Sequence, residues 1–486
     1  MNPEFHIMQS FYKSLILLTF PLLALSCSAN GPTEQTNPNI VLILVDDLGY
    51  GDIGLNGQEY IETPNLDQMA LDGMVLSQFY AGSPVCAPSR SALMTGMHTG
   101  HTHIRGNKEI QPEGQEPILD SLTTIAEVLK SSGYKTGAFG KWGLGFVGTE
   151  GDPLNQGFDQ FYGYNCQRQS HRYYPPHLWD NDTRIELPNN SPQNAEGYAP
   201  DLIQKEAFGF IEANADKPFF LFLPYTLPHA ELVVPDDSLF QKYKGKFEEV
   251  PYKGNDYAPG EVRTGYASQP YPKAAYAAMV NRIDVYVGQI MAKLEELGID
   301  ENTLVIFTSD NGPAMEGGAD PDFFDSNGIY RGYKRDVYEG GIRVPFIAKW
   351  PGKIASGSTK SHVSAFWDLL PTLADLADVN IQQKLDGISF LPTLINEGEQ
   401  EEHPYLYWEF HEQGGKQAVR KGNWKAVRLD VKDNPDGAIE LYDLREDSEE
   451  QRNVAAEHPD IVEEMAIIMD EAHVESDIFP FIKTTK

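Results

Sequence analysis

Residues 83–100 read Ser-Pro-Val-Cys-Ala-Pro-Ser-Arg-Ser-Ala-Leu-Met-Thr-Gly-Met-His-Thr-Gly, and the rest of the chain is organised around this stretch. Pro88 has the fixed φ of a first helical residue, good helix formers follow it, and Gly96 can close the turn. Cys86 is therefore expected just ahead of a short helix, where unpaired backbone N–H groups and the helix dipole favour an anion. Arg90 lies one turn further along. The stretch predicts a site for a tetrahedral anion, although position alone leaves open that Cys86 is a small buried hydrophobic residue.

Two apolar, β-rich runs each end in oxygen-bearing side chains. Residues 39–45 form the first run, which is followed by Asp46-Asp47. Residues 304–307 form the second, which leads to Asp310-Asn311-Gly312. Each polar segment alone is a common cap or turn sequence. In open α/β sheets, however, ligands bind outside the carboxyl ends of the strands, and oxygen ligands suit a hard cation.

Two further strand ends deliver a lysine and a histidine. The predicted strand at 135–139 leads into Gly140-Lys141-Trp142-Gly143, and the one at 219–223 leads to His229. A loop lysine is solvated by default, and a lone histidine after a strand is usually structural. Alternating strands and helices predict an α/β core, in which these ends reach the same edge of the sheet as Asp46.

Hydrophobic periodicity places the helices and the end of the main sheet. A further strand is expected at 343–350, and short strands with turns between them follow from residue 403. Amphipathic helices are expected at 63–72, 121–132, 201–213, 273–297, 364–377 and 460–472.

Taken together and in this order, these segments resemble the formylglycine-dependent sulfatases of the alkaline phosphatase superfamily, in a branch of bacterial carbohydrate sulfatases. The sequence Cys86-Ala-Pro-Ser-Arg90 matches the C-x-P-S-R signature of that family. The resemblance covers nearly the whole chain after the amino-terminal region. It implies a large mixed sheet sandwiched by helices over residues 38–395, and a smaller antiparallel sheet with a helix over residues 400–486.

The resemblance also implies a chemistry. A formylglycine-generating enzyme would oxidise Cys86 to formylglycine, whose hydrated aldehyde attacks the sulfur of a sulfate ester. The ligands of a divalent cation would be Asp46, Asp47, Asp310, Asn311 and the modified Cys86. Ca²⁺ is expected rather than Mg²⁺, because a flexible shell with bidentate carboxylates suits the larger ion. The remaining catalytic residues would be Arg90, Lys141 and Lys334 at the sulfate, and His229 as proton donor to the leaving alcohol.

Gly143 departs from the family pattern. Sulfatases usually read Gly-Lys-Trp-His in this segment, and that histidine contacts the formylglycine and helps to eliminate the sulfate. In this chain another group must serve, or that step differs. The position of Lys334 before Glu339-Gly340-Gly341 matches the family, although Arg331 or Arg335 could be confused with it.

The chain is strongly acidic, with 38 Lys and Arg residues against 71 Asp and Glu residues and a formal net charge of −33. This balance argues against nucleic acid or an anionic lipid surface as a partner. A local basic pocket must therefore bind the sulfated carbohydrate. Residues 150–200 are aromatic and polar without a regular pattern, as in a binding loop or a packed surface excursion. The expected substrate-binding residues are Arg105, Asn107, Arg168 and His171.

Residues 1–27 are expected to be a signal peptide, because their apolar run at 15–25 is too short to span a membrane. The end of this segment resembles a bacterial lipoprotein cleavage site, which would place a lipid on Cys27; an ordinary signal peptide is the alternative. Residues 28–37 would form a polar tether on a periplasmic or cell-surface protein. Of the other cysteines, Cys86 and Cys166 form no disulfide framework, although they could bond to one another.

The implied function is hydrolysis of sulfate esters on a glycan of galactose or N-acetylgalactosamine type. Two alternatives remain open. One is a phosphodiester or phosphonate hydrolase of the same superfamily, because an anion site does not by itself distinguish sulfur from phosphorus. The other is a non-catalytic protein that binds sulfated glycan, if Cys86 is never modified.

Overall fold

The computed structural model describes residues 37–261 and 264–481, which belong to one compact unit. The expected signal peptide at 1–27, Cys27 and nearly all of the expected tether lie outside the described residues. Within the described part, no helix combines the length and the apolar character needed to cross a bilayer.

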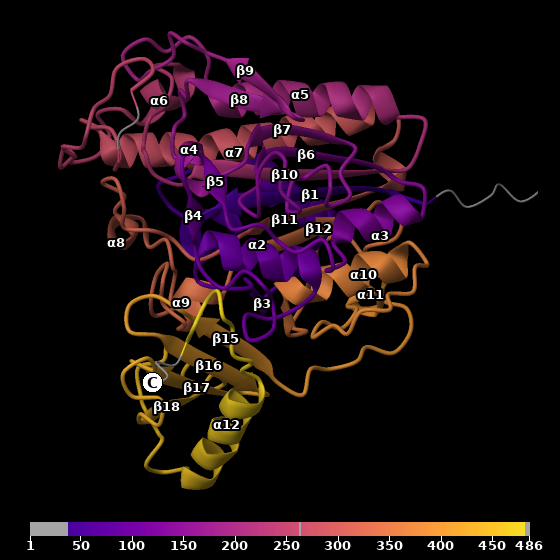
Figure 1. The fold of residues 1–486 in the computed structure, drawn as a ribbon, viewed down its shortest axis with the longest axis vertical. Coiled ribbons are helices and arrows are strands. Elements are labelled where there is room, and N and C mark those ends of the chain that lie inside the picture. Colours follow the sequence, from indigo (N-terminus) through magenta and orange to yellow (C-terminus); the bar gives the residue numbers. More distant parts are fainter. Residues whose placement is uncertain (1–36, 262–263, 482–486) are drawn as a thin grey trace, which may run out of the picture. The chain divides into compact units, whose positions relative to one another are not determined.

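A ten-stranded mixed sheet is the centre of the fold (Figure 1). Its order is β13 (Ser358–Lys360), β2 (Met74–Leu76), β12 (Phe346–Lys349), β11 (Thr303–Ser309), β1 (Asn39–Asp46), β10 (Phe219–Pro228), β6 (Lys135–Lys141), β7 (Gln160–Tyr164), β8 (His177–Asp180) and β9 (Thr183–Glu186). The strands from β11 to β7 run parallel, whereas β12 and β8 are antiparallel to their inner neighbours.

Helices cover both faces of this sheet, and β1 shows why. All eight of its residues are buried, and alternate side chains point to opposite faces. Val41 and Ile43 pack in a core with α1 (Pro64–Asp72), α5 (Ala199–Asn214) and α7 (Pro272–Glu296). Ile40 and Leu42 pack in a second core with α2 (Cys86–Thr95), α3 (Ile125–Ser131) and α10 (Leu369–Leu376). Figure 1 shows α5 and α7 on one side of the sheet and α2, α3 and α10 on the other.

A second, four-stranded antiparallel sheet follows near the carboxyl end. It consists of β15 (Leu406–Phe410), β16 (Lys416–Lys421), β17 (Trp424–Leu429) and β18 (Ile439–Asp443), with α12 (Pro459–Glu471) after it. One face, which includes Trp408, packs against Tyr80 and Trp367 of the main part. The other face, which includes Tyr407, packs against Met465 of α12. The expected fold class, a large mixed sheet between helices with a smaller antiparallel sheet and helix, is confirmed.

The remaining strands and α-helices are short. They are β3 (Phe79–Tyr80), β4 (Glu109–Ile110), β5 (Gly114–Gln115), β14 (Ser364–Ala365), α4 (Gln167–Ser170), α6 (Ser238–Tyr243), α8 (Pro321–Phe324), α9 (Glu339–Ile342) and α11 (Leu391–Ile395). The division into units at residues 395–400 stays a prediction.

The helix after Val85 begins two residues earlier than Pro88 suggests. Val85 is the extended N-cap, with φ −148°, so Cys86 is the first helical residue rather than a residue ahead of the helix. Proline is tolerated anywhere in the first turn because the N–H groups there have no intrahelical partner. Pro88 therefore marks the first turn and not its first residue.

Other segments also differ from their predicted structure, among them the helix expected at 121–132, which begins only at Ile125 because Thr124 caps it. The region 150–200 is not irregular throughout, since it contains β7, α4, β8 and β9. The strand expected at 343–350 is shorter, since β12 covers Phe346–Lys349 and Arg343 forms an isolated bridge with Tyr80. The helix expected at 364–377 starts at Leu369, because Ser364–Ala365 pair as β14 with β3. For β14, a pairing partner far along the chain decides the local structure.

Candidate active site

Four neighbouring parallel strands end at one edge of the large sheet. β1 ends at Asp46 and β6 ends at Lys141, while His229 directly follows β10 and Asp310 directly follows β11. Because parallel strands share a direction, their carboxyl ends meet at the same edge. All four side chains are buried. The structure therefore brings together residues that are more than 250 positions apart in the sequence.

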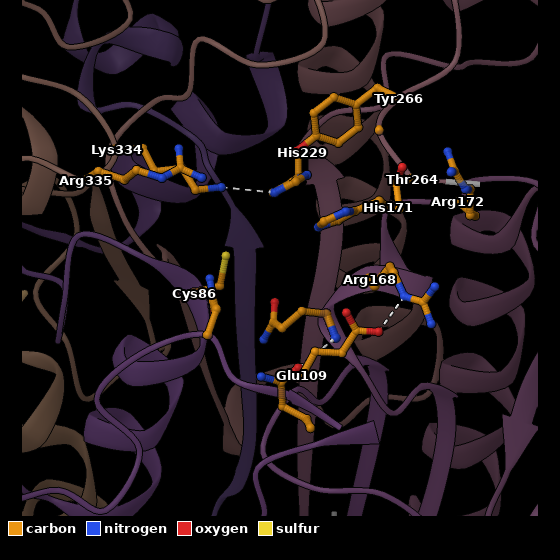
Figure 2. Close-up of a pocket in the computed structure, with 14 residues that line it drawn as sticks. Cys86, Glu109, Arg168, His171, Arg172, His229, Thr264, Tyr266, Lys334 and Arg335 are labelled. Carbon is orange, nitrogen blue, oxygen red and sulfur yellow. Dashed lines mark hydrogen bonds and ion pairs between the residues drawn. The ribbon is translucent and has the colours of Figure 1, made fainter. Parts of the chain in front are cut away.

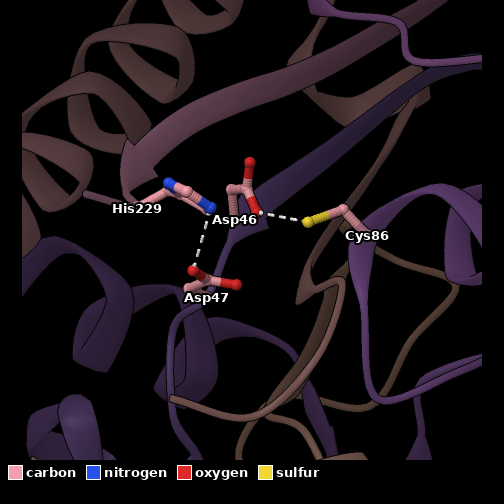
Figure 3. Close-up of side chains that lie close together, drawn as sticks. All are labelled: Asp46, Asp47, Cys86 and His229. Carbon is pink, nitrogen blue, oxygen red and sulfur yellow. Dashed lines mark hydrogen bonds and ion pairs between the residues drawn. The ribbon is translucent and has the colours of Figure 1, made fainter. Parts of the chain in front are cut away.

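Cys86 joins this edge from the first turn of α2, all ten residues of which are buried. Its Sγ lies 3.4 Å from Oδ1 of Asp46 (Figure 3). Burial, together with the charge of Asp46, raises the pKa of the thiol above its ordinary value. A buried, protonated thiol is a poor nucleophile. An unmodified cysteine in this place is therefore unsuited to attack an ester.

Arg90 contacts the acids at the ends of two strands. Its Nε and Nη2 donate to the same oxygen, Oδ2 of Asp310, at 3.0 and 2.8 Å, and Nη2 lies 3.7 Å from Oδ2 of Asp46. Although burial opposes a charged guanidinium, Asp310 and Asp46 raise the pKa of Arg90. Arg90 is thus a fixed positive charge inside the protein.

The pKa values of the carboxyl groups of Asp46 and Asp310 are shifted in opposite directions, although burial acts on both in the same way. Burial and the charge of Asp46 raise the pKa of Asp310. Despite its burial, the neighbouring Lys141, His229 and Arg90 hold the pKa of Asp46 well below its usual range. Arg90 lies near both acids. The more strongly stabilised carboxylate of the two is that of Asp46.

Two lysines pair with the two adjacent aspartates at the end of β1, Asp46 and Asp47. Lys141 Nζ lies 2.5 Å from Oδ2 of Asp46, and Lys334 Nζ lies 2.8 Å from Oδ2 of Asp47. Lys334 Nζ is also 3.0 Å from Nε2 of His229. Burial lowers the pKa of His229, and its Nδ1 donates to the carbonyl of Ala230. The Nε2 lone pair of a neutral His229 therefore accepts from the Lys334 ammonium.

The loop that carries Lys334 is held by backbone contacts that require glycine. A Cβ at Gly340 would lie 2.2 Å from the carbonyl oxygen of Gly332, and a Cβ at Gly312 would lie 2.0 Å from that of Gly340. Glu339 fixes the same loop to the small sheet, because Lys425 Nζ lies 2.9 Å from its Oε1. The small sheet therefore helps to position Lys334.

The acidic cluster fits a divalent cation. Ligand atoms of Asp46, Asp47, Cys86 and His229 lie within 4.8 Å of one another. Asn311 donates through Nδ2 to Asp47 at 2.7 Å, while its buried Oδ1 has no hydrogen-bond partner among the described residues. A buried amide oxygen without a partner, on a side chain that contacts the carboxylate of Asp47, is the ligand type that Ca²⁺ or Mg²⁺ binds. These residues could thus hold a hard cation.

A second group of possible metal ligands, His98, His101 and Asp386, is less suited to a metal. Burial lowers the pKa of His98 to about 4, so this imidazole is neutral. Its Nδ1 accepts from the N–H of Gly100 at 3.1 Å, which places the ring proton on Nε2, the atom that faces Asp386. A protonated Nε2 has no lone pair for a cation.

A cavity of about 370 Å³ opens onto Cys86. Figure 2 shows Cys86 on one side of this cavity, with His229, His171 and Tyr266 across from it. Three of the four predicted substrate-binding residues, Asn107, Arg168 and His171, line it. His171 stacks on His229 with ring centroids 4.5 Å apart, and Arg168 pairs with Glu109 at 2.6 Å.

Arg105 is placed elsewhere. It does not line this cavity, and its buried guanidinium pairs with Glu409 of β15 at 3.1 Å and donates to the carbonyl of Val474. Arg105 has a structural role in this position, because its ion pair with Glu409 connects the glycine-rich segment after α2 to the small sheet. This internal pairing does not support the substrate contact that we expect of Arg105 from the sequence.

Several cavity residues were not predicted as site residues. Tyr266 belongs to a stretch without a motif, and Arg172 and Gln167 belong to the aromatic and polar segment from which only neighbours were chosen. Arg335, whose sequence position resembles that of Lys334, lines the cavity as well and pairs with Glu316. No local pattern distinguishes these residues from ordinary loop residues.

Comparison with known proteins decides the family. Residues 38–379 match the Sulfatase family, and residues 328–474 match the family described as N-sulphoglucosamine sulphohydrolase, C-terminal. The chain belongs to the sulfatase family. It is accordingly a sulfuric ester hydrolase.

Individual sulfatases share most of the chain. N-acetylgalactosamine-6-sulfatase of Mus musculus is 33% identical over 434 residues, which cover 84% of this chain and 75% of that enzyme. Arylsulfatase A of Homo sapiens is 34% identical over 432 residues, covering 83% of this chain and 77% of that enzyme. The crystal structure of Ps i-CgsB has a TM-score of 0.74 at 28% identity and covers 90% of this chain and 92% of its own.

The wider superfamily is seen in the fold alone. The phosphonate monoester hydrolase of Agrobacterium radiobacter has a TM-score of 0.62 at 18% identity, covering 90% of this sulfatase and 96% of that chain. This likeness concerns the arrangement of sheet and helices and says nothing of the ester that is cleaved.

Proposed function

We propose that this sulfatase removes sulfate from galactose or N-acetylgalactosamine units of a glycan, with formylglycine at position 86 and a divalent cation, Ca²⁺, beside it. The observation that carries the proposal is the place of Cys86: it lies in the first turn of a buried helix, 3.4 Å from Asp46, and opens onto the cavity. A thiol in this place is a poor nucleophile, whereas the hydrated aldehyde of formylglycine would supply hydroxyl groups for attack on sulfur.

The cationic side chains around Cys86 suit the bound sulfate. Lys141, Lys334 and Arg90 are buried, and each is held by a carboxylate in a fixed position. Preorganised charges of this kind stabilise the negative charge that grows on the sulfate oxygens during transfer. A cation held by Asp46, Asp47, Asp310, Asn311 and residue 86 would supply further positive charge at the same oxygens.

The leaving alcohol needs a proton. His229 Nε2 accepts from Lys334 in this arrangement, so the proton that reaches the alcohol comes from the Lys334–His229 pair rather than from His229 alone. His171, stacked on His229, has a pKa that burial lowers well below its usual value, so it adds no competing charge.

The choice of sugar rests on relatives. Proteins named N-acetylgalactosamine-6-sulfatase are 33% identical to this chain, and the structure of Ps i-CgsB in complex with k-i-k-neocarrahexaose has a TM-score of 0.74 at 27% identity. The cavity has the size of a ligand site, and its lining offers amides, imidazoles and Tyr266 for hydrogen bonding and stacking with a sugar.

We further propose that the protein is exported from a bacterial cell and anchored by a lipid on Cys27, after cleavage of the first 26 residues. A formylglycine-generating enzyme would act on the Cys86 segment before folding, because that segment is buried in the folded chain. Radiolabelled lipid incorporation, lost in Cys27→Ser, is the measurement for the anchor.

Two measurements test the catalytic proposal. Mass spectrometry of the Cys86 peptide from protein matured in its host should show formylglycine, and the same protein should release sulfate from N-acetylgalactosamine 6-sulfate. Cys86→Ser should abolish release by at least about 10³-fold, because the nucleophile is lost. An active preparation in which every Cys86 thiol is intact would refute the formylglycine proposal.

The competing phosphate chemistry is tested on the same protein. Sulfate and phosphate esters of one alcohol are compared, and the sulfate ester should have the higher kcat/KM. A glycan-binding protein without turnover would bind the sulfated sugar but release no sulfate from either ester.

A further inference from the structure

Gln167 has a buried side chain whose hydrogen-bonding groups are unused. The residue is 7% exposed and lines the cavity that contains Cys86. Neither Nε2 nor Oε1 has a hydrogen-bond partner among the described residues. Leaving a buried amide unpaired costs free energy, so such a group usually has a partner that a ligand or water supplies.

The backbone of Gln167 accounts for its structural role. Its N–H donates to Oε1 of Gln115 at 3.4 Å, and its carbonyl accepts from Oγ of Ser170 at 2.6 Å. These contacts hold the residue in place at the start of α4 and need no particular side chain. The carboxamide is therefore free for another task.

Gly143 leaves the space that this carboxamide fills. Gly143 has a φ of +77°, and a Cβ there would lie 2.1 Å from Nε2 of Gln167. Any side chain at residue 143 would thus displace the amide of Gln167. Since Gly143 follows Lys141 by two residues, the amide lies near the end of β6, and Gln167 lines the same cavity as Cys86.

The chemistry of the amide indicates what it binds. A sulfate group offers only acceptors and would satisfy Nε2 but not Oε1. A sugar hydroxyl or an acetamido group both donates and accepts, so it can pair with both atoms. We infer that Gln167 is a specificity-determining residue, whose carboxamide binds a hydroxyl or acetamido group of the sugar that carries the sulfate. This inference rests on the proposed function.

The experiment compares two esters in the matured protein. N-acetylgalactosamine 6-sulfate carries sugar groups for Gln167, and 4-nitrophenyl sulfate carries none. Gln167→Met keeps the length of the side chain and removes both polar atoms. Gln169→Met is the matched control, because Gln169 also has an unpartnered buried Nε2 but does not line this cavity.

The measured quantity is the ratio of kcat/KM for the sugar ester to kcat/KM for the aryl ester. Gln167→Met should lower this ratio about tenfold or more, mainly through KM, and Gln169→Met should leave it unchanged. Gly143→Ala, which displaces the amide without altering Gln167, should lower the ratio in the same direction. If Gln167→Met does not fold, the ratio measured for Gly143→Ala tests the role of the Gln167 amide in its place.

A smaller fall in Gln167→Met, or an equal fall in Gln169→Met, would overturn the inference. If the wild-type protein hydrolyses neither ester, the proposed function fails, and binding then tests Gln167 separately. In a Cys86→Ala background, Gln167→Met should weaken the Kd for the sugar ester at least about tenfold relative to the Kd for the aryl ester. An unchanged ratio of the two Kd values would overturn the inference there too.

Discussion

Arg90 is a cation without access to water, and both of its stabilising partners are buried acids. Replacing it by Met leaves the carboxylate of Asp310 unpaired inside the protein, together with the carbonyl of Lys141 to which Arg90 also donates. Arg90→Met should lower the free energy of unfolding by about 3–5 kcal/mol, as when one partner of a buried pair is removed. Urea unfolding followed by circular dichroism measures this loss.

The double variant Arg90→Met/Asp310→Asn separates charge burial from catalysis. Removing the unpaired carboxylate of Asp310 should restore part of the stability. Sulfate release should stay low, because the guanidinium of Arg90 is still missing from the sulfate site. If the two substitutions destabilise additively, Arg90 and Asp310 do not act as a pair.

The acidic cluster at the end of β1 should make stability depend on Ca²⁺. A cation that binds only the folded state at one hundred times its Kd stabilises the protein by about 2.7 kcal/mol, so Ca²⁺ should raise Tm and EDTA should lower it. Asp46→Asn should lose most of this response in calorimetry. Asp52→Asn is the control, since this buried acid is paired with Ser326 and Tyr276 outside the cluster and should keep the response.

At the scale of elements, the packing of α9 and the loop before it depends on close backbone approach. Gly340→Ala places a Cβ 2.2 Å from a backbone oxygen, which cannot rotate away as a side chain can. The loop with Lys334 must therefore shift, at a cost of roughly 1–3 kcal/mol in stability together with a loss of kcat. Chemical denaturation and sulfate release measure the two effects.

Gly209 on α5 differs from Gly340, because it has free space where a side chain would be. A Cβ there meets nothing within 4 Å, so Gly209→Ala should raise stability by up to about 1 kcal/mol through helix propensity and leave kcat unchanged. A Gly340→Ala protein as stable and as active as Gly209→Ala would show that the approach of α9 to its loop is not required.

At the scale of the whole molecule, Glu409 connects its own strand, β15, to two distant parts of the chain, at His473 and Arg105. It accepts from His411 at 2.8 Å and pairs with His473 at 2.8 Å and Arg105 at 3.1 Å. Despite burial, these partners lower the pKa of Glu409 from 4.5 to about 2. A carboxyl whose pKa is lower in the folded state stabilises the fold above its unfolded value, and this contribution is lost as the pH falls from about 4.5 to about 2.

The expected contribution of Glu409 is roughly 3 kcal/mol near neutral pH. Glu409→Gln should therefore flatten the dependence of unfolding free energy on pH between about 4.5 and 2, while wild type loses stability there. Glu409 raises the pKa of His473. The contribution of His473 to the free energy of unfolding is therefore present below pH 6.5 and is lost as the pH rises above that value. Equal slopes for variant and wild type below pH 4.5 would show that Glu409 contributes no pH dependence.

Much of this architecture is predictable from sequence because its signals are local. The apolar runs that became β1, β10 and β11 are buried on both faces, and such strands read as continuous hydrophobic stretches. The long helix α7 was expected within one residue of its bounds, since a single apolar face repeats over its whole length. Short elements such as α9 and β14 were missed because their partners lie elsewhere in the chain.

The sequence by itself determined the class of fold, the family and the residues that could hold a sulfate and a cation, because motifs and hydrophobic periodicity are properties of neighbouring residues. Only the tertiary structure decided which charges meet. It paired Arg90 with Asp310, assigned Arg105 to Glu409 instead of the cavity, and placed the amide of Gln167 over Gly143. These contacts join segments whose distance depends on how strands order in the sheet, and no local pattern records that order.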